Sequence, residues 1–156
     1  MKITAAVLDA IGAVGPFAET QPMRLAALDL APPRDGELLV KIDACGLCHS
    51  DLSVVNGDRP RPMPMAIGHE AAATVLQSSP GSSFAPGDRV VLAFLPSCGK
   101  CPTCASGQGY LCASAAAANG AGMLMHGGSR LAENGHAVHH HMGVSAFATH
   151  SVIDER

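Results

Sequence analysis

The chain has 156 residues, of which 47% are hydrophobic, 15% are charged and none is tryptophan, and its formal net charge is −3. This length is enough for one domain with a packed core, built from aliphatic side chains because aromatic residues make up only 3%. The acidic balance and the absence of a Lys/Arg cluster exclude a phosphate-neutralising surface, so nucleic acid is not expected as a partner.

The chain carries no pattern typical of a membrane or secreted protein. No run of about 18 apolar residues predicts a membrane-spanning helix. Asp9 interrupts the apolar run that starts at Ile3, so no secretory signal is predicted. We therefore expect a cytoplasmic protein without membrane contacts. In a reducing cytosol the six cysteines are interpreted as metal ligands rather than as disulfide partners.

Short β-type runs separated by Gly, Pro and Asp dominate the first two-thirds of the chain. In chain order, the predicted strands are Lys2–Leu8, Arg24–Leu30, Leu38–Ala44, Ala71–Leu76 and Arg89–Phe94. Turn residues such as Ser79-Pro80-Gly81 fill the gaps between them. Strands this short at this spacing predict a mostly β, barrel-like or rolled architecture.

One short helix is expected between the third and fourth of these strands, directly after Cys48. Ser50 or Asp51 is its predicted N-cap, and Asn56-Gly57 ends it. After Cys112 the sequence becomes small and bland over residues 113–122 and then rich in histidine up to His141. We predict loop for this part and a last strand at Phe147–Ile153.

The strongest chemical signal is Cys98-Gly99-Lys100-Cys101-Pro102-Thr103-Cys104, followed by Cys112. Two residues separate each of the first three cysteines and seven separate the last two, which favours a closed structural zinc site with four sulfurs at about 2.3 Å. Buried free thiols and an iron–sulfur cluster are the alternatives. Ferredoxin-type runs place the next cysteine after three residues and follow it with Pro, whereas Ala113 follows Cys112 here. Zinc is therefore favoured.

A second group of candidate ligands lies in Cys45-Gly46-Leu47-Cys48-His49-Ser50-Asp51 and Gly68-His69-Glu70. Each segment alone is more typical of a structural Cys or His. Together with the four-cysteine loop and Gly87-Asp88-Arg89-Val90, they resemble the zinc-containing medium-chain alcohol dehydrogenases. The resemblance runs from Met1 into the last strand and implies one catalytic domain over residues 1–156. Its implied fold is a GroES-like, partly open β-barrel with short helices and a zinc-binding lobe.

The resemblance also implies roles for single residues around a catalytic zinc. Cys48 and His69 would be ligands of that zinc, and Glu70 would lie behind it. Asp51 would hold the His69 ring by a hydrogen bond, as carboxylates behind metal ligands do. Ser50 would take the proton of the substrate alcohol.

The remaining implied roles concern cofactor and substrate. His49 would face the cofactor pyrophosphate, and Phe94, His141 and Met142 would line the substrate pocket. The implied reaction oxidises a small alcohol to an aldehyde or ketone, with hydride transfer to NAD(P). The resemblance also leaves room for a homo-oligomer of the longer enzyme.

The chain departs from the family pattern in three places. Relatives take a third catalytic ligand from a Gly-Cys-Gly-like segment, and the chain ends at Arg156 without one. Ser53 stands where many relatives have a histidine that ends a proton relay, so the relay is expected to be shorter or to pass through water. The fingerprint Gly-x-Gly-x-x-Gly is absent, because Gly120-Ala121-Gly122 lacks the third glycine. We therefore expect the cofactor-binding Rossmann domain to be absent and the fragment to be inactive alone.

The histidine-rich segment His139-His140-His141 resembles a metal patch. Because neighbouring side chains of a strand face opposite ways, we expect one of the three to face the pocket and the others to meet solvent or the missing domain. His126, His136 and His150 are expected at the surface.

A different class of function stays open as the alternative, a non-enzymatic zinc-binding structural or interaction module on the same scaffold. The catalytic-type set argues against it, because a scaffold has no use for an incomplete open site; the set is Cys48, Ser50, Asp51, His69 and Glu70.

Overall fold

The structure is a computed structural model that describes all residues from Met1 to Arg156. Its strands are β1 (Lys2–Leu8), β2 (Met23–Leu30), β3 (Glu37–Gly46), β4 (Met65–Ala66), β5 (Glu70–Ser78), β6 (Arg89–Leu92), β7 (Leu131–Glu133), β8 (His136–His140) and β9 (His150–Asp154). Its helices are α1 (Phe17–Thr20), α2 (His49–Val55), α3 (Pro102–Ala105) and α4 (Ala113–Gly120), with a 3-10 turn at Gly109–Leu111. The mostly β prediction is confirmed.

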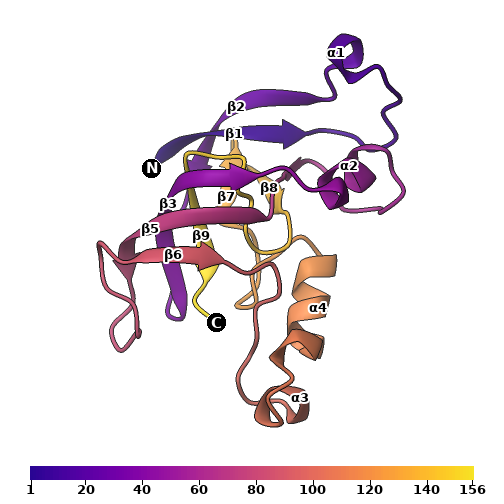
Figure 1. Cartoon of the computed structure of the whole chain (residues 1–156). Helices are drawn as coiled ribbons and strands as arrows, with labels where there is room; N and C mark the ends of the chain where they lie inside the picture. The colour runs from indigo at the N-terminus through magenta and orange to yellow at the C-terminus, as the bar shows by residue number, and fades with distance from the viewer.

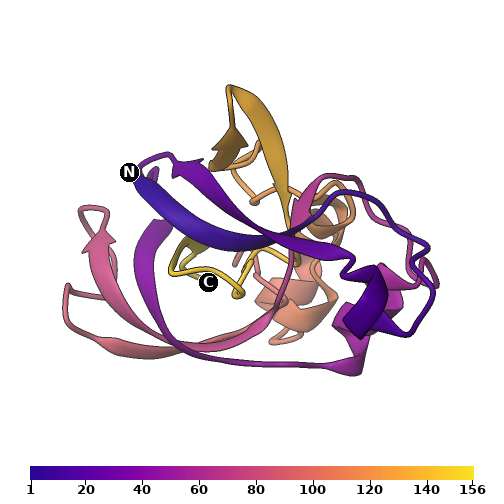
Figure 2. The same cartoon turned by 90° about the horizontal axis from the view of Figure 1, so that it is seen from above.

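The strands form two sheets around a common interior (Figures 1 and 2). One sheet closes as a barrel in the order β1-β2-β7-β8-β4, and the other has the order β6-β5-β3-β9. The backbone N–H of Ala6 donates to the Phe147 carbonyl at 2.8 Å, which joins β1 to the segment leading into β9. This is the barrel-like architecture that the short, evenly spaced strands predict.

Alternation along the strands sends apolar side chains inward. Ile3, Ala5 and Val7 of β1 are buried and pack with Leu28 of β2 in the main cluster. A second cluster includes Val40 of β3 and lies within the other sheet. Each fully buried Val or Leu contributes about 1.5–3 kcal/mol of hydrophobic stabilisation.

A third, smaller cluster fixes the helix that carries the candidate catalytic ligand. Val54 and Val55 of α2 pack on Leu8, Met65 and Ile67. The helix is therefore anchored to β1, to β4 and to the segment that runs from β4 toward His69. Burial of these side chains positions two elements of the candidate site relative to each other.

The segment from Ser97 to Cys112, here called the cysteine lobe, extends away from the sheets with α3, and α4 follows it (Figure 1). The loop predicted at residues 113–122 is wrong, because Ala113–Gly120 forms α4. Alanine is the strongest helix former, and this stretch holds five of them. The Asn119 side-chain amide donates to the Phe94 carbonyl at 3.0 Å and ties α4 to the chain after β6.

The histidine-rich segment is β8, not loop, and the last strand begins at His150 rather than Phe147. His126 and His136 are exposed as expected and His150 is half-buried, but His140 and His141 are completely buried. The expectation that the neighbours of one pocket-facing histidine meet solvent is therefore wrong for His140.

Gly122 explains part of the stretch that resembles a phosphate-binding fingerprint. Its φ is +66°, and an added Cβ would stand 2.8 Å from the His139 Cβ. The glycine is required for close approach of the chain to β8. None of the helices combines the length and the apolar composition that a membrane span requires.

Candidate metal centres

The cysteine lobe brings its four sulfurs together as predicted. The Sγ atoms of Cys98, Cys101, Cys104 and Cys112 all lie within 4.8 Å of one another. The Cys98–Cys104 separation is 3.9 Å and the Cys101–Cys112 separation is 4.0 Å. A tetrahedron with Zn–S bonds of about 2.3 Å has edges of about 3.8 Å. The donor set therefore fits a closed zinc site.

The lobe also supplies the donors that thiolates need. The backbone N–H of Cys101 donates to the Cys98 sulfur at 3.3 Å, and that of Cys98 donates to the Cys112 sulfur at 3.4 Å. The Thr103 hydroxyl, 3.1 Å from the Cys101 sulfur, lowers the pKa of that thiol to about 6, together with hydrogen bonds from Cys104. Desolvation raises the pKa of Cys104 to about 11. Four thiolates this close require a bound cation in order to ionise together.

The second group is built at the start of α2. Cys48, not Ser50 or Asp51, is the N-cap, so that expectation is wrong. The Cys48 sulfur accepts from the Ser50 backbone N–H at 3.5 Å, and an Asp51 carboxylate oxygen accepts from the Cys48 backbone N–H at 3.1 Å. This reciprocal capping box satisfies two helix N–H groups and fixes the direction of the Cys48 side chain.

Asp51 also orients His69. Its second carboxylate oxygen accepts from His69 Nδ1 at 2.9 Å, with both side chains at most 3% exposed. The lone pair of Nε2 is then free to face a metal. Ligand atoms of Cys48, His69 and Glu70 lie within 4.8 Å of one another, so the structure brings together the end of β3, the start of α2 and the start of β5.

Gly46 makes room for this convergence. A Cβ at Gly46 would stand 2.6 Å from a Glu70 carboxylate oxygen, so a larger residue there would displace the exposed Glu70 side chain from its position over the end of β3. Cys45 is exposed and belongs to neither cysteine group.

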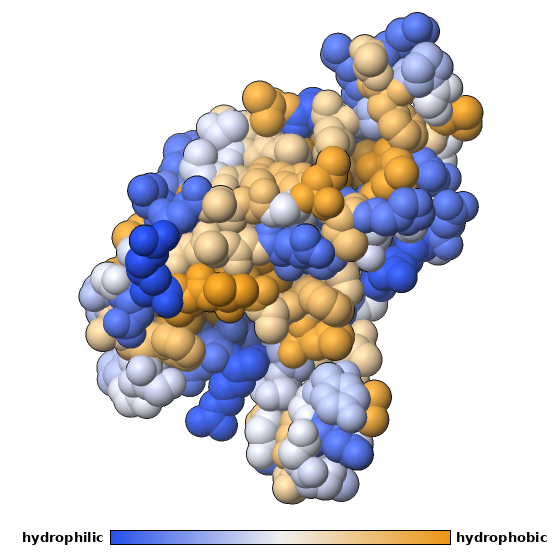
Figure 3. Space-filling view, in the orientation of Figure 1, coloured by the Kyte–Doolittle hydropathy of each residue, from blue (hydrophilic) through white to orange (hydrophobic).

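The predicted pocket residues fall in different places. Phe94 is 41% exposed, its ring packs edge-on against His69 at 5.5 Å, and it lines a cavity of about 780 Å³ together with His69 and Glu70. Figure 3 shows apolar side chains over β5 and β6 on this face, where Val91 is 86% exposed. His141 and Met142 are buried and line neither this cavity nor the second one described below.

His141 lies on the side of the His69 ring that faces Asp51. The two rings are 5.3 Å apart, and His141 Nε2 is 3.6 Å from an Asp51 oxygen, which is longer than a hydrogen bond. Neither ring nitrogen of His141 has a hydrogen-bond partner. Burial lowers the pKa of His141 to about 4, against the opposing effect of Asp51.

The residue predicted to face the cofactor pyrophosphate lies at the start of α2. His49 is exposed and lines a second cavity of about 650 Å³ with Cys48 and Asp51. Ser50 Oγ lies 3.5 Å from the Cys48 sulfur, next to the candidate metal position. The Ser53 hydroxyl donates to the His49 carbonyl at 3.1 Å, so it is engaged by its own helix.

Two arginines near this centre were not singled out from the sequence. Arg59 and Arg61 flank Pro60 in the loop that joins α2 to β4, and no ion pair involves either of them. The only sequence signal was their spacing on the segment between the two candidate ligand motifs. Among ten Lys and Arg residues, that signal is weak without the fold.

Known proteins resemble this chain in sequence and in structure. A sequence profile of the alcohol dehydrogenase GroES-like domain matches residues 34–154. S-(hydroxymethyl)glutathione dehydrogenase of Escherichia coli is 36% identical over 141 residues, which cover 89% of this chain and 38% of that protein.

Solved structures extend the likeness to nearly the whole chain. An alcohol dehydrogenase zinc-binding domain protein from Burkholderia ambifaria superposes with a TM-score of 0.87 and 35% identity over 99% of this chain and 40% of its own. Benzyl alcohol dehydrogenase from Acinetobacter calcoaceticus superposes with a TM-score of 0.84 and 32% identity, again over 99% and 40%. The 156 residues thus span about two-fifths of the length of these relatives.

Proposed function

Because the chain belongs to the alcohol dehydrogenase family as its GroES-like domain, we propose that it is the zinc-binding catalytic domain of an NAD(P)-dependent alcohol dehydrogenase. The proposed reaction oxidises a primary or aryl alcohol to its carbonyl product. The observation that supports it best is the convergence of Cys48, His69 and Glu70, with Asp51 holding His69, at a site separate from the four-cysteine site. A purely structural zinc domain has no need of the second group.

The ligand residues of this chain fit zinc in both places. The four sulfurs of the cysteine lobe would hold a structural ion, and Cys48 and His69 would hold a catalytic one. Bound there, zinc would act as a Lewis acid on the substrate hydroxyl, and NAD(P) would accept the hydride. By family resemblance a third protein ligand is a cysteine that none of the six in this chain matches. We propose that it lies outside these 156 residues, in keeping with the two-fifths coverage of the relatives.

The chain's own residues orient the substrate and handle its proton. Asp51 keeps the hydrogen on His69 Nδ1, so Nε2 stays available as a ligand atom. Ser50 Oγ, next to the Cys48 sulfur, would accept the hydroxyl proton and pass it on through water, since Ser53 is bonded to its own helix. Phe94 and the apolar wall of the 780 Å³ cavity would exclude bulk water from the alcohol. His49 would face the cofactor pyrophosphate from the start of α2.

Two features extend the proposal to location and substrate. Four of the six cysteines converge on one site, and this use of cysteine supports a reducing, cytoplasmic compartment. The benzyl alcohol dehydrogenase and S-(hydroxymethyl)glutathione dehydrogenase relatives support a primary hydroxyl as the reacting group.

The test is replacement of Cys48 in the longer protein that contains this chain. Cys48→Ala should abolish turnover of benzyl alcohol while circular dichroism and the structural zinc remain unchanged. Cys45→Ala is the matched control for loss of a thiol, because Cys45 lies in neither cysteine group although it lines the 780 Å³ cavity; it should retain the catalytic zinc and kcat, with any change confined to KM. Turnover by the Cys48→Ala enzyme would contradict the proposal.

The 156-residue chain alone is expected to bind zinc in the cysteine lobe and to show no turnover with benzyl alcohol and NAD⁺ or NADP⁺. Metal analysis that gives one tightly bound zinc per chain, with no cofactor binding by the longer protein, would favour the non-enzymatic module instead.

A further inference from the structure

The loop between α2 and β4 carries two positive charges without acidic partners. Six of the ten Lys and Arg residues form no ion pair. Arg61 differs from the other five, because its Nε is buried and has no hydrogen-bond partner. Burial lowers the pKa of Arg61, and the like charge of Arg59 lowers it further. Two guanidinium groups that repel each other, one of them partly desolvated, are unfavourable unless an anion joins them.

The loop is held in place at both ends. The Arg59 backbone N–H donates to the Ser53 carbonyl at the end of α2 at 2.9 Å. The Pro64 carbonyl accepts from the His139 backbone N–H of β8 at 2.8 Å. Pro60, Pro62 and Pro64 restrict the backbone between these anchors. The two arginines are thus carried by a restrained segment rather than by a free loop.

The loop borders the candidate catalytic centre. It leaves α2, which begins at Cys48, and it leads through β4 to His69. Met63 of the loop packs against the cluster that contains Val55 and Ile67, and these two side chains line the 650 Å³ cavity together with Cys48.

No acid of the chain neutralises this pair. Asp51 is the acid closest to the centre, but one of its oxygens accepts from His69 and the other from the Cys48 backbone. Asp58 precedes Arg59 and is exposed without forming an ion pair with it. Guanidinium groups pair with carboxylate and phosphate oxygens in a forked geometry.

We propose that Arg59 and Arg61 bind an anionic group, a carboxylate or a phosphate, at the end of the substrate remote from the reacting hydroxyl. This inference rests on the proposed function and narrows its substrate class to alcohols that carry a negative charge. The cofactor phosphates are the other source of such oxygens. The arginines follow the last turn of α2, whereas His49, assigned to the pyrophosphate, lies at its first turn. That separation favours the substrate.

Binding is tested on the zinc-loaded 156-residue chain, independently of activity. The arginine Nε–H signals are followed by NMR during titration with 4-(hydroxymethyl)benzoate, with neutral benzyl alcohol and with inorganic phosphate as separate probes. The signals of Arg59 and Arg61 should shift with the carboxylate or the phosphate and stay unchanged with benzyl alcohol. The control signal is that of Arg89, which is exposed and forms no ion pair. Equal shifts with benzyl alcohol, or none with either anion, would overturn the proposal.

Kinetics of the longer protein separate substrate from cofactor. Arg61→Gln should lower kcat/KM for 4-(hydroxymethyl)benzoate about tenfold or more and leave benzyl alcohol within about twofold. Arg61→Lys should retain part of the preference, and Arg89→Gln all of it. A rise only in the KM for NAD(P) would assign the arginines to the cofactor and overturn the substrate assignment. Absence of turnover with every substrate would count against the proposed function, while the NMR result would still decide the anion site.

Discussion

Asp51 is the residue on which the catalytic group depends most, because its two oxygens serve two ligand residues. One oxygen fixes the His69 ring at 2.9 Å and the other caps the backbone of Cys48 at 3.1 Å. The carboxylate is 1% exposed, so water does not compete for either bond. A single side chain therefore sets the direction of both candidate zinc ligands.

Asp51→Asn is expected to lower the affinity of this site for Co²⁺ by about 10–100-fold, since an amide orients and polarises the imidazole less well than a carboxylate. Optical titration of the longer protein distinguishes this mixed sulfur–nitrogen site from the four-sulfur site, which should be unaffected. Asp58→Asn, just beyond α2, is the surface control. An unchanged affinity at the mixed site would show that the hydrogen bond has no role in metal binding.

His140 makes the stability of the barrel depend on pH. It is completely buried, and its Nε2 accepts from the Arg130 backbone N–H at 3.3 Å. Burial, followed by the charges of Arg130 and His139, lowers the pKa of His140 to about 3. Above the unfolded value of about 6.5 the ring is neutral in both states and has no effect on the pH dependence. Below it, the unfolded chain binds a proton that the folded chain excludes, so stability falls toward pH 3.

From pH 6.5 to 4.5, this single group should lower the free energy of unfolding by about 2 kcal/mol. Urea denaturation of wild type and of His140→Gln across that range isolates the contribution, because carboxylates and zinc ligands titrate equally in both proteins. The His140→Gln protein should lose less stability on acidification. His136→Gln changes an exposed histidine and should behave like wild type; equal slopes for all three would contradict the assignment.

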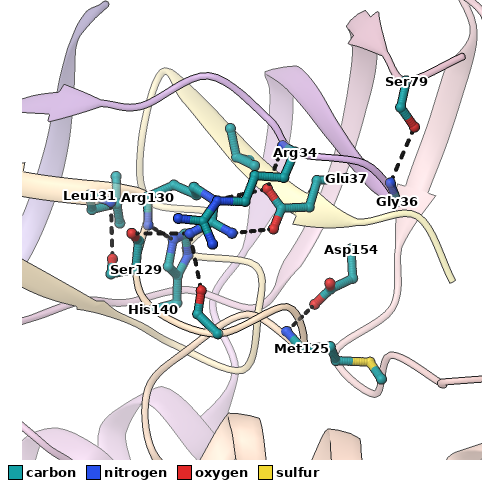
Figure 4. A network of polar contacts seen from close by, with 12 residues as sticks. Arg34, Gly36, Glu37, Ser79, Met125, Ser129, Arg130, Leu131, His140 and Asp154 are labelled. Atoms are coloured by element: carbon teal, nitrogen blue, oxygen red, sulfur yellow. Dashed lines mark hydrogen bonds and ion pairs between the residues drawn. The ribbon is translucent and has the colours of Figure 1, made fainter.

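Between elements, one buried ion pair connects the two sheets. Arg130, just before β7, donates two hydrogen bonds to the carboxylate of Glu37 at the start of β3, at 2.5 and 2.9 Å (Figure 4). Glu37 is fully buried and Arg130 is 3% exposed. The Arg34 backbone N–H donates to the same carboxylate at 2.9 Å, so the network also holds the turn before β3.

Arg130→Met should lower the free energy of unfolding by about 3–5 kcal/mol, because it leaves the Glu37 carboxylate buried without a counter-charge. Glu37→Leu combined with Arg130→Met should recover most of that loss, since both charges are then absent. Urea denaturation of the zinc-loaded chain measures both variants. A double variant as unstable as the sum of the single variants would mean that packing, not charge, sets the cost.

Strands with a period-two pattern of apolar residues could be predicted from the sequence. Elements whose formation depends on contacts with distant residues could not. The run Lys2–Leu8 has this alternation and is a strand in the structure with the same bounds. Residues 113–120 show no amphipathic pattern, because alanine fills most positions; the helix propensity of alanine was the one signal for α4, and the loop prediction did not use it. β8 could not be predicted, because the ring of its buried His140 contacts the Arg130 backbone N–H and the Ser145 hydroxyl. These partners lie ten and five residues away in the sequence, and only the fold brings them to the ring.

The candidate site was predictable as a set of residues but not as a set of geometries. Spacing alone indicated the four cysteines, and resemblance indicated Cys48, Asp51, His69 and Glu70. The roles of Cys48 as a helix cap and of His141 as an unpaired ring behind His69 required the fold. Arg59 and Arg61 are recognised as a candidate anion site only because no acidic side chain pairs with them. That absence depends on all the elements packed around the loop and cannot be seen in the sequence.

For the molecule as a whole, stability is unevenly distributed between the barrel and the cysteine lobe. All three clusters of buried apolar residues lie within the two sheets or against them. From Ser97 to Leu111, by contrast, no side chain is buried, and Cys112 is the first that is. Hydrophobic burial therefore stabilises the sheets, and metal ligation is the main interaction available to the lobe.

Removal of zinc from the lobe is therefore expected to unfold it locally and to leave the barrel intact. Hydrogen exchange of the 156-residue chain measures this residue by residue before and after chelation. The amides of Cys98 and Cys101, which donate to sulfur, should lose their protection, while Val7 of β1 and Val40 of β3 keep theirs. Cys104→Ser should reproduce the effect without chelator, and Cys45→Ser should not. Loss of protection throughout the barrel would contradict this and show that the lobe and the sheets unfold as one unit. The bond from Asn119 to the Phe94 carbonyl, which ties α4 to the chain after β6, would then be a direct polar link that couples them.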